Sequence, residues 1–305
     1  MTYYKTLWII VIVALLVAAP TASAQPDEVP PDVFEAAVDG YLYADYPGVF
    51  DDAEGDEAFG EGITIEMWIY FTEVPPERQS LHWEHWAIVA KPGSYFISAA
   101  GRALEDSVDS SLPEGHTRLI FAVESISDDH GCCNRGVGGM PLEPGEFPLK
   151  RWLHIAMQIV VKKDGTHRTE FIDRHGEVRR RFSGQMGRTE APLYVGGAPM
   201  VTFENGDTWN NDWGKPVFES MKGYIDEIRI SKGWRYVAKG NIHPKRNFRV
   251  DKRTIALWRF EEGPGAPFYR DSSGNDYTLF PGGSLDVQPL SKMNITWGSL
   301  KQGRF

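Results

Sequence analysis

The sequence predicts an all-β protein, built as an antiparallel two-sheet sandwich or jelly roll. Residues 62–71 (GITIEMWIYF) place apolar side chains at every second position, which is the pattern of a strand with one buried face. Roughly ten such short stretches follow one another, separated by glycine- and proline-rich turns. A helical period of 3.6 residues never persists for three turns, so no long helix is expected.

The later strands are joined by residues that favour tight turns. Pro92-Gly93, Asp164-Gly165 and Arg174-His175-Gly176 each interrupt an apolar stretch, as expected for hairpin connections. The remaining expected strands are 86–91, 95–101, 118–125, three within 152–182, 191–197, 222–236 and 254–263.

The first 24 residues resemble a secretory leader rather than a part of the fold. Lys5 precedes an apolar run from Leu7 to Ala19, and Ala22-Ser23-Ala24 forms a small-x-small cleavage signal. The run is short for a membrane span, so an uncleaved anchor is the weaker alternative. We therefore expect a secreted, extracytoplasmic protein that does not insert into a membrane once the leader is cut.

Length, charge and composition limit the domain organisation and the classes of possible partner. Removing 24 of the 305 residues leaves 281, enough for one large β domain with a buried core. The net charge is −10 and becomes −11 when Lys5 is lost, without any basic block. This charge argues against nucleic acid as a partner. Ten tryptophans, 31 glycines and 20 prolines are typical of a turn-rich, aromatic-rich β protein.

The two cysteines are neighbours, Cys132 and Cys133. Export favours oxidation, which ranks a vicinal disulfide bond first, a reduced buried pair second and bonds to another chain third. A ring closed by adjacent residues constrains the unfolded chain very little. His130 lies close in sequence, but one histidine beside two adjacent thiolates lacks the spacing of a closed zinc site.

Five motifs in order resemble the LamG-like jelly-roll domains of the concanavalin A-like lectin/glucanase superfamily. They are ITIEMWIYF, WAIVAK, WLHIAMQIV with FIDRHGE, LYVGG and KGYIDEIRIS, and they cover roughly residues 33–235. The resemblance implies two facing antiparallel sheets. Many members of this superfamily bind carbohydrate or protein surfaces, and many hold a structural calcium ion. The fold by itself does not define a function.

One family-like segment, residues 257–279, stands in an unusual place. In the family such a segment precedes the strand that corresponds to 62–71, whereas here it follows the domain. It either returns to the sheet or begins a truncated second copy, and we favour the return because a lone hairpin buries too little surface. The expected organisation is a linker at 25–31, a sandwich at 32–280 with 254–280 returning to the sheet, and a tail at 281–305.

Asp226 and Glu227 raise the question of catalysis. A retaining glycosidase needs two carboxylates facing one sugar, and neighbours on a regular strand point to opposite faces. The related laminarinase-like motif, Glu-x-Asp-x-Glu or Glu-x-Asp-x-x-Glu, would place its nucleophilic glutamate at position 224, where Tyr224 stands, and Ile228 likewise is no glutamate. Val160 likewise replaces the histidine of the Gln-x-His strand of alginate lyases. We therefore expect no catalytic residues, and a salt bridge between Glu227 and Arg229 if the strand alternates strictly.

The calcium that the resemblance implies has one candidate site. Calcium takes six or more oxygen ligands, and Asp271, Ser273 and Asn275 stand in a tight turn that would approach Asp226 if the segment returns to the fold. The alternative is an Asx-turn in which these side chains bond only to their own backbone.

A ligand site is expected in the loop 204–214, which combines aromatic faces with carboxylates and amides. Sugar recognition uses rings for C–H surfaces and planar polar groups for hydroxyls. The alternative is a solvated loop with its tryptophans packed beneath it. Trp68, Trp152 and Trp258 are expected in the core, and His85 with Trp86 at the start of a strand. The expected ligand residues are Glu204, Asp207, Trp209, Asn211 and Trp213.

These observations favour a secreted, non-catalytic binding module for a glycan or an extracellular protein surface, with calcium as its expected ion. A divergent polysaccharide hydrolase or lyase on the same fold is the alternative from another class. A structural adhesion module is the third.

Overall fold

The computed structural model describes most of the chain between residues 27 and 283. The predicted leader, residues 284–305 of the tail predicted at 281–305 and most of the predicted ligand loop therefore lie outside the described residues, whereas residues 281–283 belong to a strand. Within the described part, no helix is long and apolar enough to cross a membrane. The ranges left out between 27 and 283 are 37–39, 52–61, 78–84, 103–114, 128–130, 143–144, 162–166, 173–177, 183–185, 204–207, 210–217 and 237–245.

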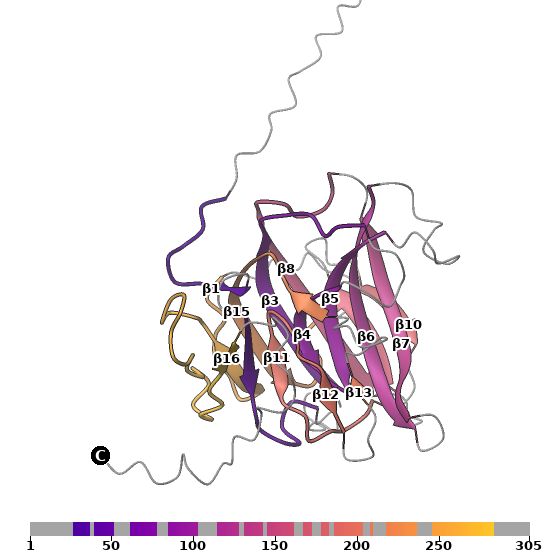
Figure 1. Cartoon of the computed structure of the whole chain (residues 1–305). Helices are drawn as coiled ribbons and strands as arrows, with labels where there is room; N and C mark the ends of the chain where they lie inside the picture. The colour runs from indigo at the N-terminus through magenta and orange to yellow at the C-terminus, as the bar shows by residue number, and fades with distance from the viewer. Residues whose placement is uncertain are drawn as a thin grey trace, which may run out of the picture.

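The first of the two large sheets is antiparallel, with the order β1-β15-β3-β8-β9-β10. The short strand β16 also pairs with β15, so β1 and β16 follow one another along the same edge of that strand (Figure 1). Its strands are β1 (Phe34–Glu35), β3 (Gly62–Phe71), β8 (Trp152–Val161), β9 (His167–Ile172), β10 (Val178–Phe182), β15 (Gly223–Lys232) and β16 (Thr254–Trp258).

The second large sheet has the order β17-β2-β11-β4-β5-β6-β7, and β14 joins β4 in parallel. A separate two-stranded ribbon, β12 (Val201–Thr202) with β13 (Thr208–Trp209), follows β11 in the chain. The strands of the second sheet are β2 (Tyr41–Ala44), β4 (His85–Lys91), β5 (Tyr95–Gly101), β6 (Thr117–Ser127), β7 (Gly131–Leu142), β11 (Leu193–Val195), β14 (Phe218–Ser220) and β17 (Phe280–Gly283).

The main core lies between the two sheets. Ile63, Ile65, Met67 and Ile69 of β3 point into it and are fully buried, because every second side chain of a strand faces the same way. Leu119, Phe121 and Val123 of β6 enter the same cluster from the second sheet. The all-β, antiparallel two-sheet jelly-roll sandwich predicted from the sequence is thus confirmed.

The outer face of the second sheet is also apolar, and Trp209 of β13 packs against it. Trp209 stacks on Phe218 with ring centroids 4.9 Å apart and an interplanar angle of 9°. Phe218 packs in turn on Phe96 of β5 at 4.8 Å. Small side chains beneath them let these rings approach the sheet closely. The small residues of this second cluster are Ala87, Ala90, Ala100, Ala122 and Ala198.

The segment after residue 253 lies against both sheets. β16 pairs with β15, and β17 pairs with β2 of the other sheet. Trp258 is fully buried in the core, as predicted, and its indole N–H donates to the carbonyl of Tyr277 at 2.6 Å. The chain from 254 to 283 therefore packs on the sandwich at the side where β15 lies (Figure 1).

The cysteine pair falls within β7, where the backbone of Cys132 pairs with that of Ile126. The side chains of this part of β7 lie outside the described residues. The vicinal disulfide therefore stays a prediction. His85 and Trp86 begin β4, as the sequence predicted.

Candidate functional site

The outer face of the first sheet, the face turned away from the core, carries polar and aromatic side chains. On β3 these are Thr64, Glu66, Trp68 and Tyr70, which alternate with the buried apolar residues. Trp68 and Trp152 are only partly buried and pair with their neighbours on this face rather than entering the core. The expectation that both are core residues was wrong, because the register of β3 and β8 turns both rings outward.

A β-bulge in β15 decides how Asp226 and Glu227 are presented. The register with β3 shifts between Ile225, opposite Ile69, and Ile228, opposite Met67. Two residues of β15 therefore stand opposite the single residue Trp68 of β3, which is how a bulge interrupts strict alternation. Both carboxylates contact groups on the outer face, so the expectation that they diverge was wrong.

Glu66 is the centre of a sealed polar cluster on this face. Its side chain is fully buried; its Oε1 accepts a hydrogen bond from Nε of Arg229 at 2.7 Å and forms an ion pair with Nη2 of the same arginine, also at 2.7 Å. Oε2 lies 3.4 Å from Nε2 of His154 and accepts a hydrogen bond from the Tyr236 hydroxyl. Burial alone would raise the pKa of Glu66, but His154, Arg229 and Tyr236 together lower it. Glu66 is therefore an ionised, fully paired carboxylate.

The chain after β15 folds down over Glu66 and closes this part of the face. Gln158 of β8 accepts hydrogen bonds from the backbone N–H groups of Arg235 and Tyr236, both at 2.7 Å, and donates to the carbonyl of Tyr236 at 3.0 Å. Arg235 also forms a bidentate salt bridge with Asp251 at 2.8 and 2.9 Å. These contacts keep Glu66 out of reach of a polysaccharide.

Glu227 is likewise engaged. Its Oε1 accepts from Nη1 of Arg259 at 2.9 Å, and its Oε2 accepts from the backbone N–H of Phe248 at 2.6 Å. The predicted salt bridge between Glu227 and Arg229 was therefore wrong, since Arg229 is bound to Glu66 and Glu227 is bound to Arg259. The bulge is the reason, because it moves Glu227 out of the regular alternation.

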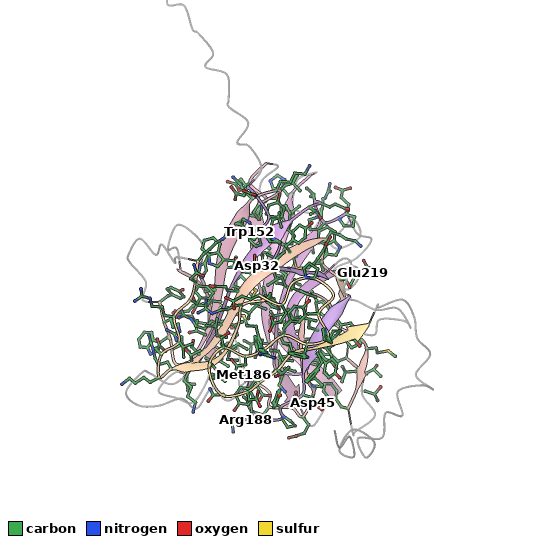
Figure 2. The ribbon with its side chains drawn as sticks, turned by 90° about the vertical axis from the view of Figure 1, so that its left-hand side faces the viewer. Asp32, Asp45, Trp152, Met186, Arg188 and Glu219 are labelled. Atoms are coloured by element: carbon green, nitrogen blue, oxygen red, sulfur yellow. The ribbon has the colours of Figure 1, made fainter. Side chains whose placement is uncertain are left out.

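The other end of the same face is aromatic, with Tyr224 and Trp152 partly exposed and Tyr70 between them only 5% exposed. Tyr224, Tyr70 and Trp152 stand on three neighbouring strands, with ring centroids 5.7 Å apart for Tyr224 and Tyr70 and 5.4 Å apart for Tyr70 and Trp152. The guanidinium of Arg246 lies 4.3 Å from the Trp152 ring centroid, a cation–π distance. We name these four residues, together with Asp226, the aromatic row. Figure 2 shows Trp152 toward the upper end of the sandwich, on the same side as Asp32.

Asp226 supplies the carboxyl group of the aromatic row. Its Oδ2 lies 3.8 Å from Nε of Arg246, and 16% of its side chain is exposed. Burial, together with the nearby carboxylates of Glu227 and Asp32, raises the pKa of Asp226 to about 6, although Arg246 opposes the shift. Asp226 is thus a carboxyl group that titrates near pH 6.

Three buried nitrogen atoms near the aromatic row have no hydrogen-bond partner within the described part of the chain. They are Nε1 of Trp68, Nδ1 of His154 and Nη2 of Arg246. Trp68 touches both others, with its ring 5.4 Å from the ring of His154 and 5.6 Å from the Arg246 guanidinium. An unpaired buried donor costs about 1–3 kcal/mol, which a bound oxygen from a ligand or an internal water would recover.

The aromatic row was missed from the sequence, although part of its signal was present. The alternation of 62–71 places Trp68 and Tyr70 on the polar side of the strand, which identifies them as outward-facing. The pairing of Tyr70 with Trp152 and Tyr224 depends on sheet register. The approach of Arg246 depends on a long-range fold of the chain, for which the sequence carries no local pattern.

Of the ligand residues predicted in the loop 204–214, Trp209 lies within the described residues, and it is a core residue rather than a binding ring. Trp209 is 1% exposed, and its Nε1 donates to Oε2 of Glu124 at 2.7 Å. Stacked on Phe218, the ring has no face left for a sugar, so Trp209 does not fit the role of a ligand residue. The other predicted ligand residues, Glu204, Asp207, Asn211 and Trp213, lie outside the described residues, and their role stays a prediction.

The turn at 271–276 uses its oxygens internally. Oδ1 of Asp271 accepts from the backbone N–H groups of Leu257 and Ser273 at 2.9 and 2.8 Å, and Oδ2 accepts from the Ser273 hydroxyl at 2.6 Å. Asn275 donates its amide N–H to the carbonyl of Ile255 at 2.8 Å. These contacts are those of an Asx-turn fastened to β16, which was the alternative to a calcium site.

Asp226 and Asp271 do not fit a shared ion. The backbone of Asp271 bridges Trp258 of β16, and β16 itself lies between this turn and β15, the strand of Asp226. Two strand spacings of about 4.8 Å separate the two chains by roughly 10 Å, whereas calcium oxygens lie about 2.4 Å from the ion. Within the described ranges, no group of three or more His, Cys, Asp or Glu could hold a metal. The shared calcium site therefore stays a prediction, and these contacts argue against it.

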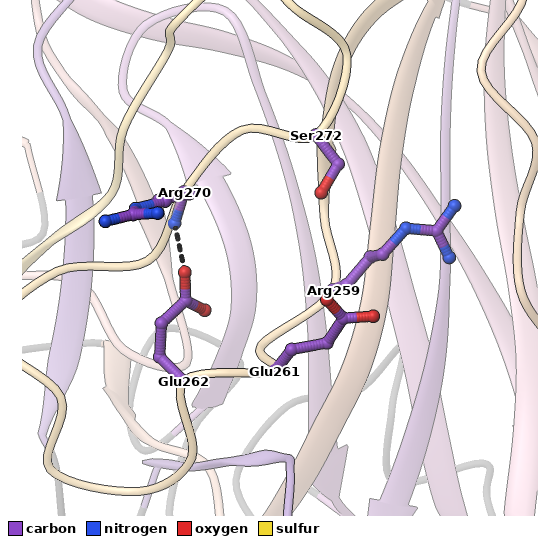
Figure 3. Close-up of a pocket in the computed structure, with 5 residues that line it drawn as sticks. All are labelled: Arg259, Glu261, Glu262, Arg270 and Ser272. Atoms are coloured by element: carbon purple, nitrogen blue, oxygen red, sulfur yellow. Dashed lines mark hydrogen bonds between the residues drawn. The ribbon is translucent and has the colours of Figure 1, made fainter.

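A small surface pocket of about 220 Å³ lies beside the same turn (Figure 3). Glu262 closes one side by accepting from the backbone N–H of Arg270 at 2.9 Å. Two arginines and two glutamates line it with opposing charges, and Arg259 is already bound to Glu227. The pocket therefore offers less to a ligand than the aromatic row does. Its lining residues are Arg259, Glu261, Glu262, Arg270 and Ser272.

Fold and site together define an antiparallel β-sandwich with an aromatic, partly open outer face. No protein-family model matches the chain, and no curated protein matches it. Among solved structures it is similar to a candidate carbohydrate-binding protein from Bacteroides ovatus ATCC 8483, with a TM-score of 0.41 and 11% identity over 81% of this chain and 58% of that one. It is also similar to the native heptameric SAP-like pentraxin from Limulus polyphemus, with a TM-score of 0.34 and 10% identity over 67% of this chain and 72% of that one.

The chain thus spans 58% of the length of the Bacteroides protein. Both TM-scores are too low for fold or function to be transferred from either protein. The description of the fold consequently rests on the two sheets themselves.

Proposed function

We propose that the protein is a non-catalytic binding module that holds a carbohydrate on the aromatic row of the first sheet. The observation that carries the proposal is the row of rings at Tyr224, Tyr70 and Trp152, with centroids 5.7 and 5.4 Å apart. Aromatic faces bind the C–H surfaces of sugars, and the planar groups of Arg246 and Asp226 beside them suit hydroxyls. A protein surface is the other ligand class that the same rings could take.

The state of the carboxylates supports a non-catalytic role. A retaining hydrolase needs two carboxyl groups that face one sugar, about 5 Å apart. Glu66 is sealed beneath Tyr236, and Glu227 is held by Arg259 and by the backbone of Phe248. Neither is available to protonate or attack a glycosidic bond.

The proposal includes an extracytoplasmic location, which follows from the leader predicted at residues 1–24. Intact mass of the exported protein tests this part by itself. A mature chain beginning near Gln25 is the expected result, and a chain that retains Lys5 would contradict it.

Binding to an array of polysaccharides, including laminarin, xylan, mannan and alginate, tests the main proposal. For the best ligand, Trp152→Ala and Arg246→Ala should each weaken the affinity about tenfold, which corresponds to about 1.4 kcal/mol. Trp234→Ala is the matched control, because this tryptophan is 39% exposed but follows the far end of β15. Full affinity in both test variants would exclude the aromatic row as the binding site.

A hydrolase or lyase remains the second candidate because of one observation. Asp226 is half-buried beside aromatic rings and has a pKa raised to about 6, which is a property of catalytic acids. Turnover of any of the array polysaccharides by the pure protein, abolished in Asp226→Asn, would establish this candidate in place of the binding module.

A further inference from the structure

A second cluster of buried charge lies around Lys91, the last residue of β4. The Lys91 side chain is fully buried, and its Nζ donates to the carbonyl of Thr189 at 2.9 Å and to the carbonyl of Ala191. Oδ2 of Asp51, which is also fully buried, lies 3.7 Å away. Every polar atom that contacts this ammonium among the described residues is an oxygen, contributed by two separate segments of the chain.

The oxygens around Lys91 carry more negative charge than one ammonium neutralises. Burial lowers the pKa of Lys91, while the carboxylates of Asp51, Glu190 and Asp45 oppose this shift. Oδ2 of Asp51 accepts from the backbone N–H of Thr189 at 2.8 Å. Its Oδ1 is buried and has no partner in the described part of the chain. The cluster therefore keeps one buried carboxylate oxygen that is unpaired within the described residues.

Carboxylate and carbonyl oxygens are the ligands that hard cations take in proteins, and the three N–H groups of an ammonium use the same oxygens. We propose that Asp51, Thr189 and Ala191 form a cation-binding cage, which the chain fills with the ammonium of its own Lys91. A free monovalent ammonium-type cation would bind in the cage when the lysine side chain is cut back. The proposal is independent of the aromatic row. Arg188 directly precedes Thr189 of the cage in the sequence, and the charge of Asp45 acts on Lys91. Both residues lie at the opposite end of the sandwich from Trp152 (Figure 2).

Chemical rescue of Lys91→Ala tests the cage directly. This variant leaves the buried Asp51 without its counter-charge, and its melting temperature should fall by about 6–15 °C. Refolding with n-propylammonium chloride, which restores both the missing carbon chain and the three N–H groups, should recover at least a third of that loss. Tetramethylammonium chloride at equal ionic strength has the charge without N–H donors and should recover nothing. Neither salt should act differently on the wild type and on the control Lys232→Ala, whose lysine is exposed at the end of β15.

Equal effects of the two salts on Lys91→Ala would overturn the proposal. Should Lys91→Ala fail to fold, Lys91→Met decides, because methionine keeps the packing of the stem and removes only the charge. Lys91→Met should melt well below the wild type, and adding Asp51→Asn should raise its melting temperature again, since the uncompensated buried charge is then removed. Lys91→Met as stable as the wild type, or a double variant less stable than Lys91→Met, would show that the cage does not require a cation.

Discussion

The two outer faces of the sandwich both carry aromatic side chains, but one face is closed and the other is partly open. On the second sheet, Trp209 and Phe218 are packed over alanines, and their face is apolar and closed. On the first sheet, Trp152 and Tyr70 stand beside Arg246 and Asp226, and their face is polar and partly open. The difference shows that a tryptophan in a polar loop can be a core residue, whereas a tryptophan within a strand can be a surface ring.

Within the first sheet, two carboxylates differ in the same way. At one end, Glu66 is sealed by Tyr236 and compensated by arginines. At the other end, Asp226 is partly exposed, at 16% of its side chain, and its pKa is raised to about 6. One carboxylate therefore stabilises the fold, and the other is free to respond to its surroundings.

The largest expected effect separates the two outer faces by stability. Trp209→Ala should lower the free energy of unfolding by about 3–5 kcal/mol, because it opens a cavity beside Phe218 and removes the donor to Glu124. Trp152→Ala should cost clearly less, since its ring is only partly buried. Urea unfolding of both variants makes the comparison. Equal losses would mean that the two faces are packed alike.

A smaller effect is expected at the sealed end of the first sheet. Glu66→Gln keeps the volume but leaves Arg229 and Arg235 without their shared counter-charge, and should cost about 2–3 kcal/mol. Glu73→Ala, at an exposed position just beyond β3, should change stability by less than about 0.5 kcal/mol. Chemical denaturation at pH 7 measures both. A Glu66→Gln variant as stable as its control would show that the cluster is not a stabilising network.

Replacing Asp226 should raise the stability of the protein, whereas replacing Glu66 lowers it, and the gain should appear only at higher pH. Its pKa of about 6 in the folded state lies above the ordinary value of 3.8, so a penalty appears as the pH rises from about 4 to 6 and is complete above 6. Asp226→Asn should therefore be more stable than the wild type at pH 8, by about 1–2 kcal/mol after allowance for solvent screening. At pH 4 most of the difference should vanish. A destabilised variant at pH 8 would mean that the salt bridge with Arg246 outweighs the burial.

The smallest effect concerns the turn at 271–276. Asp271→Ala should cost about 1 kcal/mol by freeing the N–H groups of Leu257 and Ser273. Added calcium should shift the melting temperatures of the wild type and of this variant equally, because the turn is an Asx-turn. Stabilisation of the wild type alone by calcium would restore the ion site that the geometry argues against.

The sequence could predict the elements whose pattern is local. The alternation over 62–71 predicted β3 and its buried face, and the turn residues predicted most of the strands that surround it. The burial of Trp258 was predictable for the same reason, since it ends an apolar strand.

The site could not be predicted in the same way, because its geometry depends on long-range pairing. The bulge at Asp226 and Glu227 appears only when Ile225 and Ile228 are matched to β3. The cover over Glu66 depends on the amide of Gln158, which lies 77 residues before Arg235. No pattern within a short window of sequence encodes either contact.

The return of the C-terminal segment has a consequence for the order of assembly. β17 lies at the edge next to β2, and the Tyr46 hydroxyl donates to the carbonyl of Asp276 across 230 residues. A chain emerging from the ribosome cannot close these edges until almost all of it has been made, and contacts so distant in sequence make folding slow. Until then β2 and β15 present unpaired backbone, which is prone to pair with other chains. Shortened products that stop before residue 254 should accumulate as aggregates, whereas the full chain should refold without them.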